Sequence, residues 1–160
     1  VRVIPLFIHS MLRNEPITIY GGRDKTLDFT YVDDCTDGIV RGIEALAEGR
    51  VVNQTINLAY GQGNTLVQCA ERIASELNVD PQMTMAPSLL GEVTHYVADL
   101  TKARSLLDYD PQVPLDEGIA RAVAWFREHR DAHPEEDVPV TADHEGTLGA
   151  SSVWKSAATR

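Results

Sequence analysis

The stretch YGGRDKTLDFTYVDDCTDGIVRGIEAL, residues 20–46, passes from turn chemistry through a strand pattern into a helix pattern. Paired glycines and charged residues in GGRDK indicate a tight polar loop. Apolar and polar side chains then alternate from Leu27, which predicts a strand over 27–32. The β-branched and aromatic run ITIY, at 17–20, predicts another strand on the other side of the loop.

The second part of the stretch predicts a helix that ends near Leu46. Asp33 or Asp34 is the expected N-cap, because a short carboxylate accepts hydrogen bonds from the unpaired amides of a first turn and favours the helix macrodipole. A cap is a simpler interpretation of this aspartate pair than a catalytic acid/base dyad. The apolar residues of the predicted helix recur on one face and are Ile39, Val40, Ile43 and Leu46.

Helix patterns recur along the rest of the chain. They predict a helix over 6–13 that starts at Pro5, one from the N-cap Thr65 to Leu77, one over 101–109 capped by Thr101, and one over 115–130 with Leu115, Ile119, Val123 and Phe126 on one face. TINLA at 55–59 predicts a short buried strand, and 82–86 predicts a weaker one. The aromatic residues expected in the core are Phe29, Tyr31, Trp125 and Phe126.

This alternation of strands and helices predicts an α/β domain over 1–130. Beyond it, residues 131–160 are acidic, polar and without periodicity, which predicts a disordered tail. The chain begins with Val1 inside an apolar segment, so we expect the true N-terminus to lie upstream.

The charge balance argues against a polyanionic partner. The net charge is −10, from 24 acidic and 14 basic residues, and no cluster of basic residues would attract nucleic acid or an anionic membrane. Only three of the basic residues are lysines, which favours a halophilic source. A GC-rich genome that favours arginine over lysine is the alternative.

Motifs for chemistry are scarce. Cys35 and Cys69 lack metal-ligand spacing and fit buried thiols in a reducing cytoplasm. No long apolar run predicts a membrane span, and His129 with His133 is not expected to bind a metal. The segment YGQGNTL at 60–66 is similar to the start of a dinucleotide fingerprint, but Leu66 stands where the third glycine belongs, so a structural turn is expected.

Four segments in fixed order carry a resemblance to a known family: VIPLFI with PITIYGG, DFTYVDDCTDGIVRGIEAL, TINLAYGQGNTLVQCAERIASEL, and GEVTHYVADLTKARSLLDYDPQVPLDEGIARAVAWF. From about Val1 to His129 the chain resembles the C-terminal half of the NAD-dependent epimerase/dehydratase family, the extended short-chain dehydrogenases that act on nucleotide sugars. The UDP-glucose 4-epimerase type is the most similar.

The resemblance implies an incomplete enzyme. In this family the GxxGxxG cofactor loop and the Tyr-xxx-Lys catalytic pair belong to the Rossmann half, which would precede Val1, and neither motif is in this sequence. NAD would therefore bind to the other half, and this chain would supply the binding of a nucleotide sugar, most simply a UDP-sugar, with no catalytic residue of its own. The homodimer interface of the family would also lie in the other half.

The resemblance also suggests site residues. Thr18 corresponds to a position whose backbone meets the uracil, and Tyr20 to an aromatic residue that packs on the base. Leu27 and Leu89 stand where the family places two arginines that grip the pyrophosphate. Arg2 is a candidate replacement for them, as is Arg23 or Lys25.

Two rival hypotheses remain beside an enzyme half. The chain could be a stand-alone nucleotide-sugar-binding module, or it could be an inactive truncated relic with exposed apolar surface. Loss of two charge-assisted contacts would weaken pyrophosphate binding by roughly 1.5 to 3 kcal/mol each, which is the argument for the stand-alone module.

Overall fold

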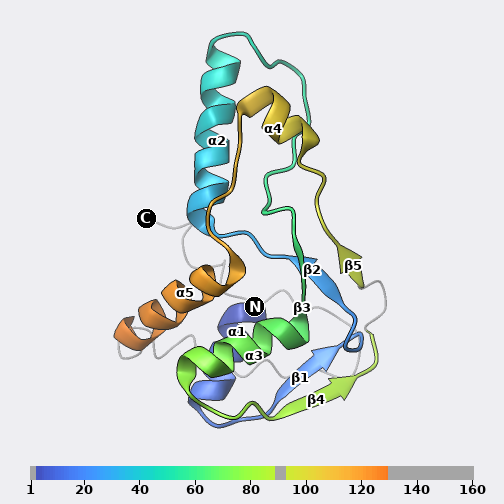
Figure 1. Cartoon of the computed structure of the whole chain (residues 1–160), viewed down its shortest axis with the longest axis vertical. Helices are drawn as coiled ribbons and strands as arrows, with labels where there is room; N and C mark the ends of the chain where they lie inside the picture. The colour runs from blue at the N-terminus through green and yellow to red at the C-terminus, as the bar shows by residue number, and fades with distance from the viewer. Residues whose placement is uncertain (1–2, 89–92, 130–160) are drawn as a thin grey trace, which may run out of the picture.

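A computed structural model describes residues 3–88 and 93–129 of the chain (Figure 1). The elements are α1 (Val3–Leu12), β1 (Ile17–Tyr20), β2 (Thr26–Asp28), α2 (Val32–Ala47), β3 (Gly63–Thr65), α3 (Leu66–Leu77), β4 (Met83–Ala86), β5 (His95–Tyr96), α4 (Thr101–Leu107) and α5 (Leu115–His129). This order of strands and helices confirms the predicted α/β class. Among these helices none combines the length and the apolar content needed to cross a bilayer.

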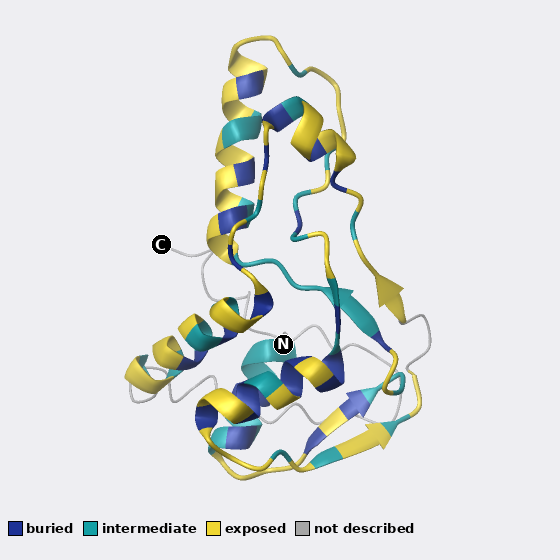
Figure 2. Ribbon diagram, viewed as in Figure 1, coloured by how far each residue is buried: buried dark blue, intermediate teal, exposed yellow. Residues whose placement is uncertain are grey.

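The main core lies where α1, α3 and α5 meet the β1 strand. Its largest fully buried side chains include Phe7, Ile8, Ile19, Ile73 and Ile119. Figure 2 shows α3 and α5 with buried residues on one side and exposed residues on the other, whereas α1 has only buried and half-buried residues. The α5 face predicted from the sequence is confirmed, because Leu115, Ile119 and Val123 are buried and Phe126 packs against the same core.

Helix α3 forms as the sequence predicts. The Thr65 hydroxyl accepts a hydrogen bond from the Gln68 amide at 3.1 Å, and the Gln68 side chain accepts one from the Thr65 amide at 2.9 Å. This reciprocal capping box satisfies two amides of the first turn. At the other end Asn78 adopts a left-handed conformation (φ 57°) and closes the helix.

The described strands form two small sheets. β1 and β4 are parallel, with Thr18 opposite Thr84 and Tyr20 opposite Ala86. In the second sheet β2 lies in the middle, antiparallel to β3 and parallel to β5. The short β5 strand and the strand character of Gly63–Thr65 were not predicted.

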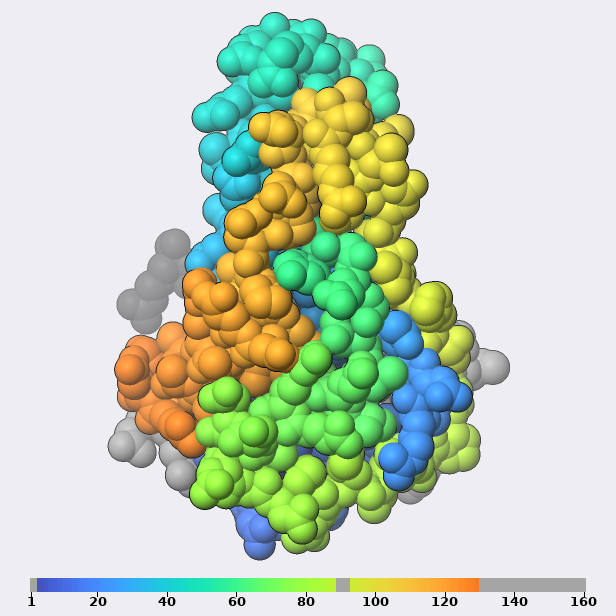
Figure 3. All heavy atoms as spheres, in the orientation of Figure 1, coloured from blue at the N-terminus to red at the C-terminus, as the bar shows by residue number. Residues whose placement is uncertain are grey.

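An arm built from α2 and α4 projects from this body, as Figure 3 shows. A second, smaller core joins the two helices through Ala45, Ala103, Leu107 and Tyr109. The Tyr109 side chain is 1% exposed, and its hydroxyl donates to the Ala59 carbonyl at 3.1 Å. Gly38 leaves room for this packing, because a Cβ would lie 2.7 Å from a Leu58 methyl group and 3.0 Å from the Tyr109 ring, so that these side chains would have to shift.

The predicted strand at 55–59 is wrong, because this segment has no strand partner among the described residues. Strands require a neighbour for their amides and carbonyls. Here side chains meet some of these groups instead: Lys102 Nζ donates to the Thr55 carbonyl at 3.4 Å, and Tyr109 donates to Ala59. Ile56 and Leu58 still pack against the small core of the arm.

The start of α2 also differs from the prediction. The strand expected over 27–32 ends at Asp28, and the N-cap position of α2 is Tyr31, which makes no side-chain cap. Asp34 instead accepts hydrogen bonds from the amides of Gln112 and Val113, at 2.8 and 3.0 Å. It is 7% exposed, so this carboxylate fastens the chain after α4 to the base of α2.

Three smaller predictions also change. Helix α4 begins at Thr101, but the N-cap position is Leu100, which makes no side-chain cap. The Asp99 carboxylate accepts a hydrogen bond from the Thr101 amide at 2.8 Å. Trp125 is not a core residue, because it is 43% exposed and stacks on His129 with ring centroids 4.5 Å apart. Cys69 is buried as expected, whereas Cys35 is only half-buried. The predicted tail at 131–160 lies outside the described residues.

Candidate functional site

The open face of the β1 and β4 pair gathers the two residues that the resemblance suggested for base binding. Strand side chains alternate between faces, and in β1 Ile17 and Ile19 are buried while Thr18 is exposed and Tyr20 half-buried. Thr18 and Tyr20 therefore share the face that points away from the core. The parallel register puts Thr84 and Ala86 on the same face.

The backbone of β1 adds an unpaired edge to this face. The Ile17 amide donates to the Gln82 carbonyl at 2.8 Å and the Gly21 amide to the Ala86 carbonyl at 3.2 Å. Backbone groups alternate between the two edges of a strand, so those of Thr18 and Tyr20 point away from β4. No other described strand pairs with that edge. It offers the Thr18 carbonyl as acceptor and the Tyr20 amide as donor, beside the Tyr20 ring.

An aromatic ring beside such an edge suits a planar ligand. Flat heterocycles stack on tyrosine, and a base that has a donor next to an acceptor can pair with a strand edge. The geometry can therefore hold a base by stacking together with two backbone hydrogen bonds. These interactions bind a ligand without catalysing a reaction, and they require no group that gains or loses a proton.

Of the other suggested pyrophosphate positions the structure describes only that of Leu27, and this residue does not join the open face. Leu27 lies in the middle of β2, in the second sheet, where it is half-buried and packs against the main core. Arg2 and Leu89 lie outside the described residues. Of the two loop cations, Lys25 is only 5% exposed, whereas Arg23 is exposed and is therefore the better placed to meet a phosphate.

The glycine-containing turn after Ala59 is structural. The Asp28 carboxylate accepts hydrogen bonds from the amides of Tyr60 (3.2 Å), Gly61 (2.9 Å) and Ala98 (3.1 Å). Amides that would face a pyrophosphate in a cofactor loop are thus committed to a carboxylate of the protein. This agrees with the interpretation of the segment as a turn.

Groups with perturbed pKa values lie away from the open face. Burial, together with the Asp34 carboxylate, raises the pKa of Tyr109 to about 12, so this phenol stays a hydrogen-bond donor. Burial raises the pKa of the Cys69 thiol to about 12 as well. Hydrogen bonds from Thr101 lower the pKa of Asp99. Within the part of the chain that the structure describes, no cluster of three or more His, Cys, Asp or Glu side chains could hold a metal ion.

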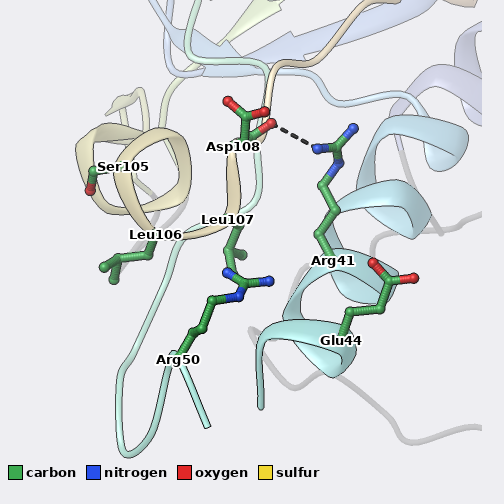
Figure 4. Close-up of a pocket in the computed structure, with 7 residues that line it drawn as sticks. All are labelled: Arg41, Glu44, Arg50, Ser105, Leu106, Leu107 and Asp108. Atoms are coloured by element: carbon green, nitrogen blue, oxygen red, sulfur yellow. Dashed lines mark hydrogen bonds between the residues drawn. The ribbon is translucent and has the colours of Figure 1, made fainter. Parts of the chain in front are cut away.

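A hollow of about 310 Å³ lies in the arm between α2 and α4 (Figure 4). Its charged lining is balanced, with Arg41 and Arg50 against Glu44 and Asp108. Arg41 already binds Asp37 at 2.6 Å and the Asp108 carbonyl at 2.9 Å. Because these cations are already paired within the protein, the hollow offers little free positive charge to an anion. The open face is therefore the better candidate for a binding site.

Two residues of the site region were missed at the level of sequence. Thr84 was assigned only to a weak strand, and nothing in its local pattern indicates that its hydroxyl lies 3.1 Å from that of Thr18. Asp28 was noted only as part of an alternating strand. Its role depends on amides more than 30 residues away, which no local period can indicate.

Comparison with known proteins assigns the fold to a class. The family model described as GDP-mannose 4,6 dehydratase matches residues 1–122. The chain also superposes on the Bacillus cereus UDP-glucuronic acid 4-epimerase in complex with UDP-glucuronic acid and NAD, with a TM-score of 0.74 and 27% identity. That match covers 79% of this chain and 40% of the solved one. The fold is therefore that of the C-terminal part of an extended short-chain dehydrogenase.

Relatives of known name agree with this class. The chain is 30% identical over 125 residues to UDP-glucose 4-epimerase of Mycolicibacterium smegmatis, covering 78% of this chain and 37% of that protein. It is 31% identical over 126 residues to UDP-glucuronic acid decarboxylase 1 of Xenopus tropicalis, covering 79% of this chain and 29% of the relative. The chain belongs to the NAD-dependent epimerase/dehydratase family and spans less than half the length of these relatives.

Proposed function

We propose that this chain is the nucleotide-sugar-binding part of an NAD-dependent epimerase/dehydratase, most like UDP-glucose 4-epimerase, and that its ligand is a UDP-sugar. The observation that carries the proposal is the β1 edge with which no other described strand pairs, where the Thr18 carbonyl and the Tyr20 amide adjoin the Tyr20 ring. Related proteins whose names specify UDP-sugars support the ligand class. The base would stack on Tyr20 and pair with the edge, and Arg23, an exposed cation of the loop after β1, would meet the diphosphate.

The described residues do not fit NAD. Among the described residues, the turn at 60–66 is similar to a cofactor loop, but its Tyr60 and Gly61 amides donate to the Asp28 carboxylate. We therefore assign NAD to the other part of a complete enzyme, where hydride transfer would occur. Binding and orientation of the nucleotide sugar remain the contribution of this chain.

An exposed apolar face supports a partner of this kind. On α2, Val32, Ile39, Ile43 and Leu46 are each at least 50% exposed. A contiguous apolar stripe on a helix normally packs against another element. Beside the same arm, the segment 55–59 lacks a strand partner among the described residues. We propose that the cofactor-binding part covers this face of α2 and pairs with 55–59.

One observation favours a second candidate, a stand-alone binding module. Leu27 packs in the protein where a phosphate-gripping arginine was expected, so the diphosphate loses a charge-assisted contact. Such a protein would hold the nucleotide mainly through its base. Binding of UDP nearly as tightly as UDP-glucose, without NAD, would favour this module.

Isothermal titration of the 160-residue chain with UDP-glucose and UDP tests the proposed site. Substitution Tyr20→Ala should weaken binding by about 1 to 3 kcal/mol, the worth of one base stacked on an aromatic ring. Tyr96→Ala is the matched control, because Tyr96 is a 53% exposed tyrosine in the other sheet and should leave affinity unchanged. Equal losses in both variants, or no binding by the unaltered chain, would refute the proposed site.

We also propose a cellular location, the cytoplasm, and a halophilic source for this protein. Both cysteines are free, which fits a reducing cytoplasm. The net charge of −10 fits a halophilic protein, because dissolved salt screens repulsion between surface carboxylates. A melting temperature that rises steadily into molar NaCl would support this origin, and one that is insensitive to salt would exclude it.

A further inference from the structure

Four passages of the chain join the arm to the body: β2 to α2, α2 to β3, β5 to α4, and α4 to α5 (Figure 1). The two parts have separate apolar cores, because the main core is built from α1, α3, α5 and β1, whereas the small core joins α2 and α4. Among the described elements, α2 and α4 pack mainly on each other. The angle between arm and body therefore depends on contacts at the passages.

Asp28, the last residue of β2, ties the second and third passages to the first. Its Oδ1 accepts a hydrogen bond from the Tyr60 amide at 3.2 Å. Its Oδ2 accepts from the amides of Gly61, at 2.9 Å, and Ala98, at 3.1 Å. Hydrogen bonds to an ionised acceptor are roughly twice as strong as neutral ones, and they favour a narrow range of angles. One carboxylate thus holds three backbone groups from two passages in a fixed arrangement.

Asp34, in the first turn of α2, ties the fourth passage to the first in the same way. Its Oδ1 accepts from the Gln112 amide at 2.8 Å, and its Oδ2 accepts from the Val113 amide at 3.0 Å. Asp28 and Asp34 lie at the two ends of the passage from β2 to α2. Every other passage is therefore held by a carboxylate of this first one.

Another contact crosses from the arm to the body at the surface. The Arg121 guanidinium of α5 lies 5.0 Å from the centroid of the Tyr31 ring and 3.5 Å from the Asp33 carboxylate. Arg121 and Asp33 are both exposed, and exposed ion pairs contribute little because water and salt screen them. This surface pair is the weaker tie, and the two carboxylates that hold backbone amides are the stronger ones.

We infer that Asp28 and Asp34 together form a joint that fixes the orientation of the arm relative to the body. The use of this orientation rests on the proposed function, in which the body carries the base-binding face and the arm carries the partner face. The joint would then orient a bound nucleotide sugar toward the part of the enzyme that covers α2. Small errors in the placement of reacting groups cost rate, so fixed orientation matters even where both faces are intact. Asp28 and Asp34 are thus positioning residues that act through the amides they hold.

Residual dipolar couplings of the amides in the 15N-labelled 160-residue chain measure this orientation without any ligand. In the unaltered chain, one alignment tensor should fit the amides of α2 and α4 together with those of α3 and α5. The double variant Asp28→Asn and Asp34→Asn keeps the size of each side chain, but one acceptor oxygen in each becomes an NH2 group that repels the amide facing it. The arm and the body should then need separate tensors, with the helical circular dichroism retained. A role in local stability alone would lower the unfolding free energy and keep one tensor.

The matched control is the double variant Asp37→Asn and Asp116→Asn, which changes the net charge equally. Asp37 pairs with Arg41 inside the arm and Asp116 with Arg72 inside the body, so neither pair crosses the joint and one tensor should persist.

A single tensor in the variant that lacks both Asp28 and Asp34, or separate tensors already in the unaltered chain, would overturn the inference. If that double variant does not fold, Asp28→Asn alone decides, because it releases the second and third passages and should also require separate tensors. The couplings need no nucleotide, so a failure of UDP-glucose to bind would count against the proposed function and leave the joint standing.

Discussion

Helices α3 and α2 both have an apolar face in their sequences, but this face is buried in α3 and exposed in α2. In α3 the apolar face, including Leu66, Ile73 and Leu77, is buried in the main core. In α2 the buried residues are Asp34, Gly38 and Ala45, and the apolar face is exposed, with Ile43 at 62%. Periodicity thus predicts that a helix has an apolar face, but it does not predict which element covers that face.

The contrast should appear most strongly in two matched truncations. Ile73→Ala leaves a cavity in the main core and should lower the free energy of unfolding by about 2 to 5 kcal/mol. Ile43→Ala removes the same atoms from the exposed face of α2 and should change it by less than about 0.5 kcal/mol. Urea denaturation followed by circular dichroism measures both. Equal losses would mean that α2 is covered in solution.

The polar inner side of α2 gives the next largest effect. Asp34→Ala leaves the part-buried amide of Gln112 and the buried amide of Val113 without their acceptor, and should cost about 2 to 4 kcal/mol at about 1 to 2 per amide. Asp33→Ala is the control, since Asp33 is exposed and makes only a surface ion pair with Arg121 at 3.5 Å. The same urea titrations apply. A small effect at Asp34 would show that water replaces the carboxylate and that the base of α2 is open.

Stability at alkaline pH reports on the burial of the Cys69 thiol. The pKa of Cys69 in α3 is raised to about 12 by burial, so the folded state keeps a proton that the unfolded state loses near its usual pKa of about 8.5. Stability contributed by this thiol is complete below that pH and falls by about 1.4 kcal/mol per unit as pH rises toward 12. Tyr109, with its pKa also raised to about 12, adds to the loss from about pH 10.

Unfolding measured against pH tests this assignment. Cys69→Ala should remove the part of the slope that begins near pH 9, about 1.4 kcal/mol per unit. An unchanged slope in Cys69→Ala would contradict the burial of α3.

A dye measurement gives the smallest expected effect. The fluorescence of anilinonaphthalene sulfonate should rise in the presence of the chain, because the dye binds the exposed apolar face of α2. Lysine at both Ile39 and Ile43 should lower the signal, with a change in unfolding free energy within about 0.5 kcal/mol per site. Val79→Lys, at an exposed valine outside α2, is the control and should keep the signal. A signal that survives the double substitution would place the dye elsewhere.

The sequence predicted elements better than it predicted pairings. The helix starting at Thr65 was predicted correctly because its cap, capping-box glutamine and apolar period are all local. The strand at 55–59 was not, because a strand exists only beside a partner, and none of the described strands pairs with it. Asp34 was assigned a local role as a cap, whereas its contacts lie 78 and 79 residues away.

The site was predictable to a similar degree. Family resemblance suggested Thr18 and Tyr20, and alternation along β1 places them on one face. It could not indicate Thr84, because the register of β1 against β4 joins segments 66 residues apart. Resemblance also put Leu27 at a position where the family grips the pyrophosphate, and only the three-dimensional arrangement reveals that this residue lies in a different sheet from Thr18 and Tyr20.

The most direct test of the proposed binding site is a titration of the 15N-labelled 160-residue chain with UDP-glucose, followed by amide shifts. We expect saturable shifts of the amide resonances of Thr18, Tyr20 and Thr84, and no shifts of the amides in the α2 and α4 arm. Shifts confined to the hollow lined by Arg41 and Arg50, or no shifts up to millimolar ligand, would contradict it.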